Sequence, residues 1–221
     1  MLLHIENLTF GWQKDTLFEG INCRLEKNDI IQLIGENGTG KTTLLNLISG
    51  MIPHFNRGSM LEGDIYVNGC SMLKVSPKNL FPTIALIPCV NLELFLLTET
   101  LSQEILLTRS ILKIDANQFN KQLKDFMMFF PDIPEFINLP LKELHINQKI
   151  LALTFIFFLQ NCRLYLFDEV LADFSESLIQ QWYAFFKWLS SKGCAVIFVD
   201  HQQHAEGFLQ WILKDKKLIQ L

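Results

Sequence analysis

Short runs of mostly apolar residues recur along the chain and predict strands that are buried on both faces. The runs cover residues 29–34, 84–87, 164–167 and 195–199. Such runs are typical of the inner strands of a parallel sheet, which helices cover on both sides. Apolar positions with helical spacing follow in 91–160 and again in 176–191. Strands that alternate with helices in this way predict an α/β fold with a parallel core.

The beginning of the chain has a different pattern. Residues 1–34 read as a β-rich start in which polar and apolar positions alternate between residues 2 and 6, and a turn is expected at 11–15. Residues 64–69 read as a further strand that ends in a turn.

The centre of the chain reads as several helices in succession. Helix-capping spacing occurs at Thr100 and at Asp115, each with a glutamine three residues later. We therefore expect a single domain of 221 residues. Its core would comprise about 1–90 and 161–221, and its inserted helical subdomain about 91–160.

The composition of the chain is unusually apolar, since 49% of the residues are hydrophobic and 19 are Phe. The longest apolar run, 150–159, is about half as long as a membrane span. It predicts a buried helix and no transmembrane segment. Two explanations of the composition stay open: an exposed apolar face that docks on a membrane partner, or a general bias of amino-acid usage.

The net charge and the cysteines give further indications of the partners and the cellular compartment of the protein. A net charge of −4 provides no broad basic field, so nucleic acid is not an expected partner. The five cysteines are scattered and odd in number, which favours reduced thiols in a cytosolic protein over disulfides or zinc. The N-terminus does not read as a signal peptide.

The most informative motif lies between the strand 29–34 and a helix that is expected from Thr43. It matches G-x-x-x-x-G-K-[ST] at every position from Gly35 to Thr42. The binding residues predicted from the motif and the residue after it are Gly35, Asn37, Gly38, Thr39, Gly40, Lys41, Thr42 and Thr43. Glycines let the backbone N–H groups of such a loop surround phosphate oxygens at a helix N-terminus. Lys41 would contact the β- and γ-phosphates, and the Thr42 hydroxyl would hold Mg²⁺. The motif predicts binding of a nucleoside triphosphate.

Asp168 and Glu169 follow directly on the apolar run 164–167. A carboxylate at the end of a buried strand beside the loop is suited to hold Mg²⁺, and its neighbour is suited to orient or deprotonate water. Taken alone, the pair could equally be an acidic helix cap. His201 follows the strand 195–199 and is placed to contact the γ-phosphate, although a lone His is more often structural.

Together these residues resemble the ATP-binding subunit of ATP-binding cassette (ABC) transporters over almost the whole chain. The resemblance implies a P-loop NTPase (RecA-like) core with an antiparallel β subdomain and an inserted α-helical subdomain, with ATP and Mg²⁺ as cofactors. It also implies the site residues: adenine stacks on Trp12, Thr42 and Asp168 hold the metal ion, and the catalytic group comprises Lys41, Glu169 and His201. The segments 52–65 and 94–98 are similar to importers of the energy-coupling-factor type.

The chain departs from the family's pattern at three places. Cys89 stands where the family has the Q-loop glutamine, and Ser175 stands at the D-loop aspartate position. His145-Ile146-Asn147 replaces the Ser-Gly-Gly of the signature motif, which in the family closes over the partner subunit's phosphate loop. A β-branched Ile146 would keep backbone N–H groups away from a phosphate that glycine would admit.

These departures imply an asymmetric pairing. The chain keeps the residues of its own phosphate loop and has lost those it would lend to a partner. The resemblance therefore predicts an ATP-hydrolysing transporter subunit that pairs with a second ABC ATPase with an intact signature and with transmembrane subunits. Such a subunit would be cytoplasmic and peripheral on the membrane. An ATP-binding regulatory subunit with little hydrolysis and a non-transport ABC ATPase stay as alternatives. A GTPase is disfavoured because no Asn-Lys-x-Asp motif is present.

Overall fold

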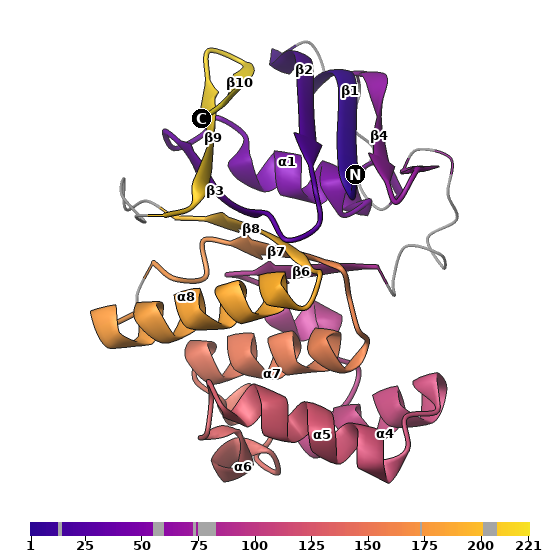
Figure 1. Ribbon diagram of the computed structural model, residues 1–221, viewed down its shortest axis with the longest axis vertical. Coiled ribbons are helices and arrows are strands. Elements are labelled where there is room, and N and C mark those ends of the chain that lie inside the picture. Colours follow the sequence, from indigo (N-terminus) through magenta and orange to yellow (C-terminus); the bar gives the residue numbers. More distant parts are fainter. Residues whose placement is uncertain (13–14, 55–59, 73, 75–82, 173, 201–206) are drawn as a thin grey trace.

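The chain folds into two β-sheets with helices on both sides of the larger one (Figure 1). The computed structural model describes residues 1–12, 15–54, 60–72, 74, 83–172, 174–200 and 207–221. The smaller sheet is antiparallel with strand order β2-β1-β4-β5. Its strands are β1 (Leu3–Trp12), β2 (Asp15–Leu25), β4 (Met60–Val67) and β5 (Cys70–Ser71).

The larger sheet has the strand order β10-β9-β3-β8-β7-β6 and is parallel except for β10. Its strands are β3 (Ile30–Gly35), β6 (Ile84–Pro88), β7 (Leu164–Asp168), β8 (Ala195–Val199), β9 (Leu209–Lys214) and β10 (Lys217–Gln220). One face carries α1 (Lys41–Ile48) and the smaller sheet, and the other carries α7 (Ile146–Leu159) and α8 (Glu176–Ser191) (Figure 1). The fold is therefore a P-loop NTPase fold with an additional antiparallel sheet, and the predicted fold class is confirmed.

Strands β6, β7 and β8 are almost entirely apolar because each side chain enters one of two cores. In β7, Leu164 and Leu166 enter the core that faces α1, whereas Tyr165 and Phe167 enter the core that faces the helices. The same alternation holds in β6 and β8. A strand between two cores needs no polar face, which is why no two-residue periodicity marks it in the sequence.

The middle of the chain is helical, as the sequence predicts. It comprises η1 (Leu92–Phe95), α4 (Leu101–Leu112), α5 (Ala116–Met127), α6 (Ile133–Phe136), η2 (Leu141–Glu143) and α7. Thr100 caps α4 through a reciprocal pair of hydrogen bonds with Gln103, and Asp115 accepts a hydrogen bond from the Gln118 N–H at the start of α5. The division of the chain near residues 90 and 160 stays a prediction.

The apolar composition is largely accounted for by an aromatic core on the helical side of the larger sheet. Phe126 packs against Phe155, Phe158 and Phe185 with ring centroids 5.0 to 5.6 Å apart. The apolar run 150–159 lies in α7. Its residues are buried except for Leu151, which is partly buried, so the predicted buried helix is confirmed. Among the described residues, no helix combines the length and hydropathy of a membrane span.

Local differences from the sequence predictions concern element ends. The turn expected at 11–15 is shorter, because Gly11 pairs with Thr16 and Trp12 with Asp15 in the β1–β2 ladder. Helix α1 begins at Lys41, two residues earlier than expected. The short helix α2 (Met51–His54) follows it, with Ile52 outside helical geometry.

Strands β9 and β10 were not predicted. They form a hairpin at the edge of the larger sheet, where β9 pairs with β3.

Candidate active site

The loop between β3 and α1 is shaped by glycines in conformations that other residues rarely adopt. Gly38 has φ +82° and Gly40 has φ +100°. A Cβ atom on Gly40 would lie 2.8 Å from both Leu17 Cδ2 and Phe18 Cζ, so this glycine is required by packing as well as by backbone angle. The loop therefore reaches α1 with the free N–H groups of the helix N-terminus at its centre.

Lys41 is the first residue of α1, and its side chain is 4% exposed. The ammonium group donates hydrogen bonds to the carbonyl oxygens of Gly35 (3.0 Å) and Glu36 (3.2 Å). It also lies 3.9 Å from Glu169 Oε1. The loop carbonyl oxygens thus hold the Lys41 ammonium beside the N–H groups of the loop. An anionic ligand bound by these N–H groups would lie within reach of the ammonium.

Thr42 and Asp168 bring two separate elements together. The Thr42 hydroxyl donates to Asp168 Oδ1 at 3.1 Å, although β8 lies between β3 and β7 in the sheet. Burial raises the pKa of Asp168 to about 6, a shift that Glu169 increases and that the Thr42 hydrogen bond and Lys41 reduce. A carboxylate whose charged form is disfavoured by burial is stabilised by a cation, so the pair fits Mg²⁺.

Glu169 follows β7 with φ +55°, in the left-handed region that non-glycine residues seldom occupy. Its side chain is about one-third exposed and lines a cavity with Lys41. Because Asp168 points to Thr42 while Glu169 lines the cavity, the adjacent carboxylates can hold a metal ion and act on water, respectively.

The cavity has a volume of about 470 Å³ and connects the loop to an aromatic side chain. It is lined by Trp12, Leu17, Asn37, Gly38, Gly40, Lys41, Thr42, Thr43 and Glu169. Trp12 is 40% exposed, and its ring meets Phe10 edge-on at 5.1 Å between centroids. A flat aromatic face at one end and a glycine loop with a lysine at the other match the two ends of ATP.

Most residues predicted for this site therefore lie together. Gly35 ends β3, and the Thr39 hydroxyl donates to the Glu36 carbonyl inside the loop at 2.9 Å. Leu17 was not predicted, and only the packing of β2 against the loop reveals it. His201 lies outside the described residues, so its role stays a prediction.

The three positions at which the sequence predicts departures from the family's pattern lie on three different elements. Cys89 directly follows β6, whose last residue Pro88 pairs with Asp168. Ser175 precedes the first residue of α8, and its hydroxyl lies 3.2 Å from that of Ser177. The signature segment is part of a helix: His145 caps α7, and Ile146 opens it with 48% of its surface exposed.

One contact near the site has no sequence signal. The Tyr183 hydroxyl on α8 donates to Asp200 Oδ2 at 3.0 Å, and Asp200 directly follows β8. The ring of Tyr183 also contacts Phe198 and Phe208, at centroid distances of 5.7 and 5.1 Å. Tyr183 therefore fixes the chain on either side of residues 201–206.

Fold and loop together define a nucleotide-binding protein of the P-loop NTPase class. Comparison with known families is more specific, because the ABC transporter model matches residues 18–172. The chain belongs to the ABC transporter family, as an ATP-binding subunit.

Individual relatives agree with this assignment. An ABC transporter ATP-binding protein of Haemophilus influenzae is 38% identical over 95 residues, which cover 43% of this chain and 34% of the relative. The ribose import ATP-binding protein RbsA 2 of Rhizobium meliloti is 24% identical over 218 residues, 94% of this chain and 39% of the relative. The chain thus spans little more than a third of the length of these curated relatives.

The solved ATP-binding subunit of an ABC transporter supports the fold alone. It superimposes with a TM-score of 0.82 at 21% identity, over 99% of this chain and 88% of the other.

Proposed function

We propose that this chain hydrolyses ATP to drive a membrane ABC transporter, as one half of an asymmetric pair of ATPase subunits. One observation carries the proposal: Lys41, Thr42, Asp168 and Glu169 meet at one end of a cavity that has Trp12 at the other. Each side chain has a distinct task in phosphoryl transfer to water.

In this proposal the chain's residues act in a defined order. The loop N–H groups and the Lys41 ammonium bind the triphosphate, which replaces the loop carbonyls as partner of Lys41. Thr42 and Asp168 would hold Mg²⁺, which neutralises charge that develops on the transferred phosphate. Glu169, freed from Lys41, orients the attacking water and accepts its proton.

The pairing is supported by the first turn of α7. His145, Ile146 and the partly exposed Asn147 present side chains there, where the family has small residues that close over a partner's nucleotide. A homodimer would place this turn over both nucleotides, whereas a partner with an intact signature would complete the site on this chain. We therefore infer that the active site of the pair is built on Lys41 and Glu169.

A transmembrane partner is supported by exposed apolar side chains after β6. Val90, Leu94 and Leu97 are 62%, 75% and 79% exposed. A cavity of about 520 Å³ lies beside them, lined by Leu96, Thr98, Glu99, Pro140, Leu141, Lys142 and Lys149. An apolar surface next to a cavity suits the docking of another protein. Such docking would place the chain on the cytoplasmic face of the membrane.

An ATP-binding regulatory subunit is the second candidate, and the combined changes at Cys89, Ile146 and Ser175 favour it. The test measures ATP hydrolysis by the purified chain alone and after co-expression with the ATPase and membrane proteins encoded beside it. We expect MgATP binding with slow hydrolysis alone, and about 10²-fold faster hydrolysis in the complex, the size of one lost oxyanion-type contact. Equal rates in both preparations would refute the asymmetric pair, and binding without hydrolysis in either would establish the regulatory candidate.

A further inference from the structure

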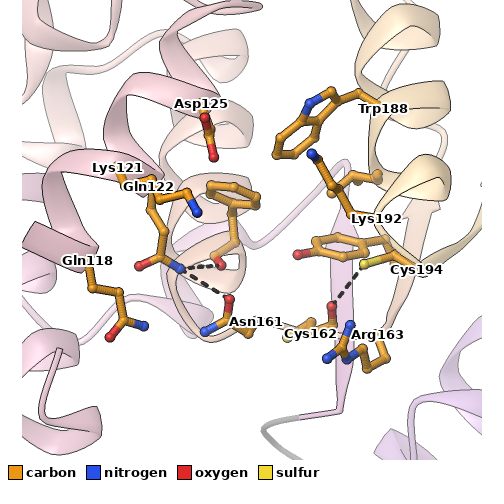
Figure 2. Close-up of a pocket in the computed structure, with 13 residues that line it drawn as sticks. Gln118, Lys121, Gln122, Asp125, Asn161, Cys162, Arg163, Trp188, Lys192 and Cys194 are labelled. Atoms are coloured by element: carbon orange, nitrogen blue, oxygen red, sulfur yellow. Dashed lines mark hydrogen bonds between the residues drawn. The ribbon is translucent and has the colours of Figure 1, made fainter.

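A second cavity lies at the end of the larger sheet remote from the nucleotide cavity. It has a volume of about 370 Å³ and is formed by α5, the segment before β7, and the C-terminal end of α8 (Figure 2). Arg163 and Cys194 in its lining directly precede β7 and β8, whereas Asp168 ends β7. Since β7 rises about 3.3 Å per residue, the two cavities are roughly 13 Å or more apart.

Three cationic side chains line this cavity, and they come from three different segments. Lys121 comes from α5, Arg163 from the segment before β7, and Lys192 from the end of α8. Among the described residues, none of the three has a carboxylate within ion-pair distance. The Lys192 ammonium lies 5.2 Å from the centre of the Trp188 ring, and Figure 2 shows both side chains on the side of the cavity opposite α5. Arg163 contacts the Cys194 thiol, but among the described residues no carboxylate neutralises the three positive charges.

The remaining lining leaves the cavity positive. Among the described residues that line it, Asp125 is the one carboxylate, against three cations, although the whole chain has a net charge of −4. Burial raises the pKa of the Cys162 and Cys194 thiols, so neither adds a negative charge near neutral pH. A positive, partly enclosed surface on an acidic protein concentrates anions locally.

The walls are aromatic and held in place. Phe158, Tyr165 and Trp188 line the cavity. The Gln122 amide donates to the Phe158 carbonyl at 3.4 Å and to Asn161 Oδ1 at 3.3 Å, which ties α5 to the end of α7. Flat apolar walls accept a ring, and a cavity of this size belongs to the lower range of small-molecule sites.

We propose that this cavity binds a small phosphorylated molecule with a planar ring. Its phosphate would face Lys121 and Lys192, which Figure 2 shows on opposite sides of the cavity, and its ring would lie against Trp188 and Phe158. Arg163 would add positive charge at the other end of the cavity. Phosphate fits better than a monovalent anion because several cations can each donate to its oxygens. Because the ligand would touch α5 and α8 together, it would hold the helical region against the sheet.

The test is calorimetric titration of the full chain with phenyl phosphate as probe. We expect saturable binding, about tenfold weaker binding of inorganic phosphate because it lacks the ring, and no binding of phenol because it lacks the charge. The Lys41→Ala chain should bind the probe within twofold of wild type, which separates this site from the nucleotide cavity. Absence of phenyl phosphate binding, equal binding of phenol, or loss of binding in Lys41→Ala would each overturn the proposal.

Variants locate the site. Lys121→Gln and Lys192→Gln should each weaken phenyl phosphate binding about tenfold or more, and Asp125→Asn should strengthen it. Lys124→Gln is the matched control, since Lys124 is exposed on the same helix but does not line the cavity. If Lys124→Gln weakens binding as much as Lys121→Gln, the probe senses only the general charge of α5, and the proposal fails.

Discussion

Helices α1 and α7 begin in opposite ways. Both present free N–H groups and the positive end of a helix dipole, which favour phosphate. At α1, Gly38 and Gly40 open the approach and Lys41 adds a charge. At α7, His145 and Ile146 are exposed at the corresponding position and cover the backbone with side chains.

From this difference we infer that side-chain volume, and not the helix dipole, decides which terminus can approach a phosphate closely. The Cβ branch of Ile146 cannot be withdrawn by rotation, so it keeps a γ-phosphate at a distance even when the helix dipole attracts it. In the proposed pair, the α1 terminus binds the chain's own nucleotide, whereas the α7 terminus is poorly suited to a partner's. The following variants test this contrast.

Glu169→Gln should have the largest effect. The amide keeps the shape of the side chain but cannot accept a proton, so hydrolysis in the assembled complex should fall by about 10²–10⁴-fold. ATP affinity should stay within a few-fold, since Lys41 and the loop remain. Steady-state phosphate release and nucleotide binding measure the two effects.

The matched control is Glu176→Gln, an exposed glutamate at the start of α8 that does not line the cavity. It should leave both quantities unchanged. A wild-type rate in Glu169→Gln would show that the partner's site performs the hydrolysis. The nucleotide bound at the α1 terminus would then not be the one that is hydrolysed.

Restoring the signature should have the second-largest effect. The combined change His145→Ser, Ile146→Gly and Asn147→Gly reopens the α7 terminus. Made in a Glu169→Gln background, it should raise hydrolysis at the opposite site by about 10²–10³-fold, provided that the partner's loop is sound.

Its control is His145→Ser alone, which leaves Ile146 in place and should restore little. Thermal unfolding checks that two added glycines, each costing up to about 1 kcal/mol in a helix, leave the chain folded. No gain in a folded triple variant would mean that Ile146 is not what limits the opposite site.

Local sequence patterns were enough to predict the phosphate loop that leads into α1. A phosphate loop is a continuous segment, and its glycines, lysine and flanking strand all act within a few residues. The strand ends at Asp168 and Val199 were predictable for the same reason, because apolar runs mark strands that are buried on both faces.

Contacts between distant segments could not be predicted in this way. The Tyr183–Asp200 hydrogen bond joins a helix to the end of a strand, and the second cavity joins α5 to α8, which are far apart in sequence. The hairpin β9–β10 was missed because its strands are only partly buried at a sheet edge and lack a continuous apolar run. The resemblance to energy-coupling-factor importers stays a prediction, since it rests in part on residues 55–59, outside the described chain.

Lys41→Ala should have a smaller effect. It should weaken the affinity for MgATP more than it lowers the rate of hydrolysis. The charge lost from the phosphates corresponds to roughly 1.5–3 kcal/mol, or about 10–100-fold weaker MgATP binding. Lys27→Ala is the control, because Lys27 is exposed in the turn before β3. Unchanged affinity in Lys41→Ala would mean that the α1 terminus holds the triphosphate without its lysine, and that charge contributes less than the glycine-shaped backbone.

Trp12→Ala should have the smallest effect, since it touches the base and not the phosphates. Ring stacking is worth about 0.5–1.5 kcal/mol, so ATP affinity should fall by roughly two- to tenfold, whereas Trp12→Phe should stay near wild type. ATP should also change the tryptophan fluorescence, and most of this change should vanish in Trp12→Ala. Trp182 and Trp211 are nearly inaccessible and supply a steady background, whereas any change at Trp188, which lines the other cavity, would persist in Trp12→Ala. If Trp12→Ala binds ATP as tightly as wild type, the aromatic end of the cavity does not hold adenine, and the phosphate contacts at α1 alone account for binding.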